Sequence, residues 1–72
     1  MSIDELIKTM RTRAGFSAAR LADELGCAIQ SVYNWEHGDT LPNAETLLSI
    51  ARICGYELIF RPKPKEFYGG ED

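Results

Sequence analysis

The sequence lacks the runs and residue clusters that several classes of protein need. No apolar stretch approaches the roughly 20 residues of a membrane-spanning helix, and the opening residues, MSIDE, hold no basic region before an apolar run, so no signal peptide is expected. Only two cysteines occur, Cys27 and Cys54, without a CxxC or CxxH partner, which favours small buried thiols over a zinc site. The single histidine, His37, has no nucleophile or pairing carboxylate around it. These absences predict a cytoplasmic protein with no metal or cofactor and no enzymatic activity.

An excess of positive charge is also lacking, but the position of the charges matters more than their total. The net charge is −3, yet residues 1–65 contain eight Lys and Arg against eight Asp and Glu. The acidic excess comes from Glu66, Glu71 and Asp72 at the end of the chain. Residues 6–35 are mildly basic, which permits nucleic-acid binding. At 72 residues the chain makes one small domain, a size at which oligomerisation is a common source of stability.

The spacing of apolar residues predicts helices in residues 1–55. The predicted helices span residues 3–13, 18–25, 28–37 and about 43–54. Ser2 and Ser17 suit the N-caps of the first two, and Pro42 and Asn43 precede the fourth. A glycine follows each helix: Gly15, Gly26, Gly38 and Gly55. In the fourth helix the predicted inward residues are Leu47, Leu48, Ile50, Ala51 and Cys54.

The segment YELIFRP, residues 56–62, follows a different pattern. Tyr56, Leu58 and Phe60 alternate with Glu57, Ile59 and Arg61, and this period of two with β-branched and aromatic content predicts a strand that ends at Pro62. The sequence offers no partner strand, so we expect antiparallel pairing with a second copy across a two-fold axis. The predicted dimerisation residues are Tyr56, Leu58, Ile59 and Phe60. A fifth helix is the alternative, and residues 62–72 are expected to form a flexible tail.

The second and third predicted helices satisfy the constraints of a helix-turn-helix. Ala22 is small enough for two helices to cross closely, and Gly26 can make the tight turn between them. The residues expected to face inward are Leu21, Leu25, Cys27, Val32 and Trp35. In this arrangement the second helix lies in the major groove of DNA.

Residues 3–55 resemble the Cro and cI repressor family, also called the xenobiotic-response-element type. The most specific pieces are LADELG, residues 21–26, and WEHGDTLP, residues 35–42. The resemblance implies a bundle of four or five helices that binds operator DNA as a dimer. The fold class is therefore predicted as all-α, with residues 1–55 as the DNA-binding domain. The sequence departs from the family at Ala18, where Gln usually contacts phosphate, and at Ala28, where Ser or Thr usually caps the third helix.

Matching positions to the family implies a role for each residue of the site. The implied base-reading residues are Ile29, Gln30, Asn34 and, at the edge, Tyr33. Amides can pair with adenine and an apolar side chain can meet a thymine methyl, although such residues also occur on an ordinary solvated helix face. Candidate phosphate contacts are Arg11, Arg13, Arg20, His37, Gly38 and Thr40, with solubilising charge as the alternative for Arg13 and Arg20. The resemblance also implies an ion pair between Arg11 and Glu36.

The expected function is that of a sequence-specific, homodimeric repressor, encoded by a bacterium or a phage, that binds double-stranded DNA. An antitoxin that also binds and neutralises a partner toxin protein is the alternative. The features that favour the antitoxin are the YELIFRP segment and the tail with Phe67 and Tyr68.

Overall fold

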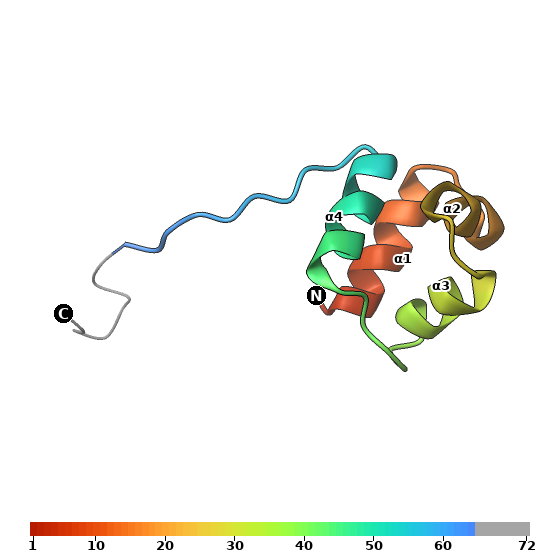
Figure 1. Ribbon diagram of the computed structural model, residues 1–72. Coiled ribbons are helices and arrows are strands. Elements are labelled where there is room, and N and C mark those ends of the chain that lie inside the picture. The colour runs from red at the N-terminus through yellow and green to blue at the C-terminus, as the bar shows by residue number, and fades with distance from the viewer. Residues whose placement is uncertain (65–72) are drawn as a thin grey trace.

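Four helices, and no strand, form in residues 1–64, which are the residues that the computed structural model describes. The helices are α1 (Ile3–Arg13), α2 (Ala18–Leu25), α3 (Ile29–Glu36) and α4 (Ala44–Ile53), and Figure 1 shows them gathered into one bundle. The predicted all-α class is confirmed. The third helix is one residue shorter at each end than the sequence indicated.

Local hydrogen bonds explain where three of the helices begin. The Ser17 hydroxyl accepts the backbone N–H of Arg20 at 3.0 Å, and the Asn43 side chain accepts that of Thr46 at 2.7 Å. At the start of α1 the Ser2 backbone N–H donates to the Glu5 carboxylate at 3.2 Å. These bonds satisfy donors that the first turn of a helix leaves without an intrahelical partner.

The turn between α2 and α3 depends on Gly26. Its φ of 73° lies in the left-handed region, where a side chain would be strained. Ala22 is 4% exposed, and its small side chain lets α2 pack closely on α3. The chain can therefore reverse within three residues, which places α3 across α2 as a helix-turn-helix requires.

The core lies where the four helices meet. Helix α1 packs against α3 and α4, and α2 packs against the same two helices. The largest fully buried side chains are Ile7, Met10, Leu21, Val32 and Ile50. The prediction that Leu48 is buried is wrong: it lies about 100° around α4 from Leu47, outside the stripe that faces the core.

Beyond α4 the chain leaves the bundle as an extended segment (Figure 1). Residues 56–64 form neither a strand nor a helix, so the alternative of a fifth helix is wrong for the described part of the chain. The strand stays a prediction, because a strand needs a partner that one copy does not supply. Leu58 packs against the core, while Ile59 and Phe60 are exposed. The predicted tail lies outside the described residues from position 65 onward.

No helix in residues 1–64 is long and apolar enough to cross a membrane. The longest, α1, has 11 residues.

Candidate nucleic-acid interface

Helix α3 presents two chemically different faces. Val32 is fully buried and Trp35 is partly buried against the core. On the other side Ile29, Gln30 and Tyr33 are exposed and Asn34 is partly exposed. The structure therefore brings all four predicted base-reading residues onto one accessible surface, which we call the α3 face.

Two contacts order side chains on or beside this face. The Gln30 amide nitrogen, Nε2, donates a hydrogen bond to Asn34 Oδ1 at 3.0 Å, one helical turn away. The rings of Tyr33 and His37 stack with their centroids 6.4 Å apart and an interplanar angle of 14°. Because each contact joins residues four apart, both follow from helical geometry.

An ion pair fastens the end of α3 to α1. Arg11 Nε lies 2.6 Å from Glu36 Oε2, and Arg11 Nη2 donates to Glu36 Oε1 at 3.0 Å. The side chains are only 14% and 6% exposed, and the hydrogen bonds that Arg11 donates to Glu36 raise the pKa of its guanidinium. Two parallel bonds fix both position and orientation, so the pair holds α3 against the bundle.

The same contacts turn the Arg11 side chain toward the interior of the protein. Its remaining terminal nitrogen, Nη1, donates to the Phe16 carbonyl at 2.9 Å, so all three guanidinium nitrogens have partners inside the protein. Two of the five guanidinium N–H donors remain, but the side chain is only 14% exposed, so a phosphate contact by Arg11 stays a prediction. The interior position of the side chain, between α1 and α3, could not be read from its type.

Arg13 and Arg20 remain accessible to an anion. Arg13 is exposed at the end of α1. The Arg20 guanidinium lies 4.5 Å from the centroid of the Phe16 ring and forms an exposed ion pair with Glu24 at 3.3 Å. This contact with Phe16 was not predicted from the sequence, although the four-residue spacing of a cation and an aromatic ring is a signal for it.

The loop after α3 offers fewer anion-binding groups than predicted. The Gly38 N–H donates to the Trp35 carbonyl at 3.2 Å, and the Asp39 N–H donates to the Asn34 carbonyl at 2.9 Å. The N–H of Gly38 therefore already has a partner, and its contact with phosphate stays a prediction. The Thr40 N–H has only a long bond of 3.4 Å to Asn34, and its side chain is exposed. The prediction of phosphate contacts in this loop did not take the negative charge of Asp39 into account.

Comparison with known proteins assigns the family. A family model described as helix-turn-helix matches residues 7–60, well over half of the 72-residue chain. The chain belongs to the Cro/cI-type helix-turn-helix family. It is accordingly a DNA-binding regulator of transcription, and the family is not typically enzymatic. No curated protein and no solved structure matches the chain.

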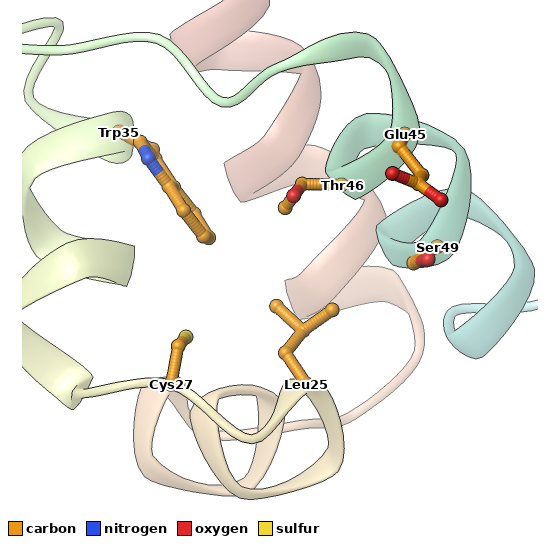
Figure 2. A pocket seen from close by; sticks show the side chains of 6 residues that line it. All are labelled: Leu25, Cys27, Trp35, Glu45, Thr46 and Ser49. Atoms are coloured by element: carbon orange, nitrogen blue, oxygen red, sulfur yellow. The ribbon is translucent and has the colours of Figure 1, made fainter.

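The regulator also has a hollow of about 300 Å³ that is separate from the α3 face. Trp35, Cys27 and Leu25 point toward it from the α2–α3 side, and α4 supplies the remaining lining residues (Figure 2). Burial raises the pKa of the Cys27 thiol, which keeps it protonated and weakly reactive at neutral pH. None of the predicted base-reading residues lines this hollow.

The start of α3 has no side-chain cap, unlike the starts of α2 and α4. Ala28 holds the N-cap position with φ −74° and ψ 145°, and no side chain accepts a hydrogen bond there. We expect Ala28→Ser to raise the free energy of unfolding by about 1 kcal/mol, because a serine hydroxyl can accept an N–H of the first turn. Urea denaturation measures the change. Ser17→Ala, which removes the cap of α2, should lower stability by a similar amount; a loss there without a gain at Ala28 would contradict the prediction.

Proposed function

We propose that this regulator is a homodimeric repressor that binds a pseudo-palindromic operator. Its two α3 helices would enter successive major grooves about 34 Å apart. The observation that carries the proposal is the division of α3 into a buried, anchored side and an exposed side of amide, aromatic and aliphatic groups. Only the exposed side is free to meet base edges.

The residues of the α3 face have complementary roles in this proposal. Gln30 and Asn34 carry the donors and acceptors that read base edges, and Ile29 offers an apolar surface to a thymine methyl. Tyr33, stacked on His37, lies at the edge of the face. Each good amide–base pair would contribute roughly 1–3 kcal/mol of discrimination.

Phosphate contacts position the protein but do not select sequence. The accessible candidates are Arg13, Arg20, His37 and Thr40. Arg11 is not among them, because its side chain is only 14% exposed and bonds to Glu36 and the Phe16 carbonyl.

The dimer would form through residues 56–61. Ile59 is 63% exposed and Phe60 is 88% exposed in one copy, while the neighbouring Leu58 is anchored on the core. An anchored, extended segment with exposed apolar side chains and free backbone edges suits pairing with its own symmetry mate. Tyr56, whose N–H donates to the Ala51 carbonyl at 2.7 Å, would begin this strand.

An antitoxin is the second candidate, and the same exposed side chains favour it. Ile59 and Phe60 could contact a partner toxin protein in place of, or together with, a second copy. Deletion of residues 62–72 keeps these two side chains and removes Phe67 and Tyr68 of the tail; loss of partner capture with intact DNA binding would favour an antitoxin that also uses the tail. Unchanged DNA binding and no partner protein in pull-down experiments would favour the simple repressor.

The test of base reading begins with selection of an operator from random DNA by the wild-type protein. Gln30→Ala is expected to weaken binding to the selected operator about fivefold or more and to leave binding to random DNA almost unchanged. Arg13→Ala should weaken both by the same factor, because a phosphate contact carries no sequence information. Fluorescence anisotropy at fixed salt measures all four affinities. Equal losses on both DNAs for Gln30→Ala would refute base reading by this face.

A further inference from the structure

The first observation concerns the hydrogen-bonding groups that α3 can offer to DNA. The helix, IQSVYNWE, contains neither Lys nor Arg. Those two side chains make the commonest specific contact to guanine, because guanine presents two acceptors, O6 and N7, in the major groove. On the α3 face the amides of Gln30 and Asn34 are the groups that offer a donor and an acceptor side by side.

The second observation is that one amide hydrogen of Gln30 is already used. Its Nε2 carries two hydrogens, and one is donated to Asn34 Oδ1 at 3.0 Å. Gln30 then keeps a single N–H donor together with its Oε1 acceptor. The Asn34 amide nitrogen keeps both of its hydrogens for other partners.

This remaining pair of groups matches adenine and mismatches guanine. Adenine presents the N6–H donor and the N7 acceptor, so Gln30 Oε1 and its remaining N–H can bind both. Toward guanine the single N–H could satisfy only one of the two acceptors, and Oε1 would face the other without a hydrogen between them. An unrestrained glutamine, with both hydrogens available, would discriminate between the two purines less strongly.

We propose that Gln30 reads an adenine in each operator half-site and that Asn34 sets this preference by holding the Gln30 amide. The inference rests on the proposed function and adds the base chemistry of its operator. Asn34 acts here as a positioning residue for Gln30. Ile29, the residue before Gln30, is available for a thymine methyl, so the operator bases under this end of α3 are A·T pairs.

The experiment first locates the base pair that Gln30 reads. In the operator selected from random DNA, this base pair is the one at which the Gln30→Ala variant no longer prefers one base over another. Its base preferences at the other positions should be unchanged. At this base pair the wild-type protein is expected to prefer A·T over G·C by about fivefold or more. Replacing this adenine with 7-deazaadenine, which lacks the N7 acceptor, should weaken wild-type binding by a similar factor.

Two substitutions at Asn34 then test the positioning role. Asn34→Ala removes the acceptor and is expected to reduce the A·T preference at the Gln30 position to about twofold or less. Asn34→Asp keeps an acceptor oxygen for Gln30, so this variant should retain the preference even though its added negative charge lowers affinity for all DNA. Circular dichroism melts check that the domain is folded in both variants.

The possible failures are distinguishable. A wild-type preference for G·C at this position, or an Asn34→Ala variant that keeps the full preference for A·T, would overturn this inference and leave base reading by α3 intact. Failure of the wild-type protein to select any DNA sequence would overturn the proposed function itself, and this inference with it.

Discussion

Glu36→Gln is expected to lower the free energy of unfolding by about 2–4 kcal/mol, the largest loss we expect from a single substitution outside the apolar core. The glutamine keeps the size of the side chain but leaves the Arg11 guanidinium, 14% exposed, without a counter-charge in the bundle. A domain of this size has only about 3–5 kcal/mol to lose. Urea denaturation at one fixed protein concentration measures the change, because dimerisation makes stability depend on concentration.

A matched control exists on the surface of the same molecule. Arg20 and Glu24 form an ion pair whose side chains are 57% and 45% exposed. Glu24→Gln should cost at most about 1 kcal/mol, since water screens an exposed pair. Similar losses for Glu24→Gln and Glu36→Gln would mean that burial does not strengthen the Arg11–Glu36 pair.

The double variant Arg11→Met with Glu36→Leu distinguishes two free energies: the cost of leaving one buried charge unpaired, and the contribution of the ion pair itself to stability. Replacing both charges by apolar groups of similar volume often restores stability. We therefore expect the double variant to unfold at a higher urea concentration than Glu36→Gln. Its DNA affinity is also informative, because the ion pair is what holds the end of α3 against α1.

The helices of this protein could be predicted because their signals are local. Caps such as Ser17 and Asn43 act on backbone groups within the next three residues, and Gly26 ends α2 through its own φ angle. Such features depend on neighbouring residues alone, so the order of residue types reveals them. The error at Leu48 came from treating a run of apolar residues as a stripe, whereas α4 turns one of them to solvent.

Contacts that depend on how the helices pack could not be predicted from such local signals. The Arg11–Glu36 pair was implied only by the family resemblance, and the bond from Arg11 to the Phe16 carbonyl was not expected; both are set by the packing of α1 on α3. The amide of Gly38 was expected to be free for phosphate, but the end of α3 provides a carbonyl for it. A sequence shows which donors and acceptors exist; only the fold shows which of them are already paired.

A proline in residues 56–61 is expected to convert the dimer to a monomer and to weaken operator binding about a hundredfold or more. Consecutive N–H groups of a strand point to opposite edges, so we would place Pro at Ile59 in one variant and at Phe60 in another. One of the two must remove a donor from the edge that pairs with the second copy. Sedimentation velocity measures the oligomeric state, and anisotropy measures the loss of the second, effectively intramolecular, binding event.

The proline variants should not disturb the fold of one copy. In residues 1–64 the amide of Ile59 donates to no backbone oxygen, and its side chain is exposed, so no helix loses a hydrogen bond. Leu41→Ser is the matched control, since it removes a similarly exposed aliphatic side chain, 69% accessible, from a different loop. A dimer that persists in both proline variants and dissociates in Leu41→Ser would place the interface beside the start of α4. That geometry would leave residues 56–60 free for a partner protein and so favour the antitoxin over the simple repressor.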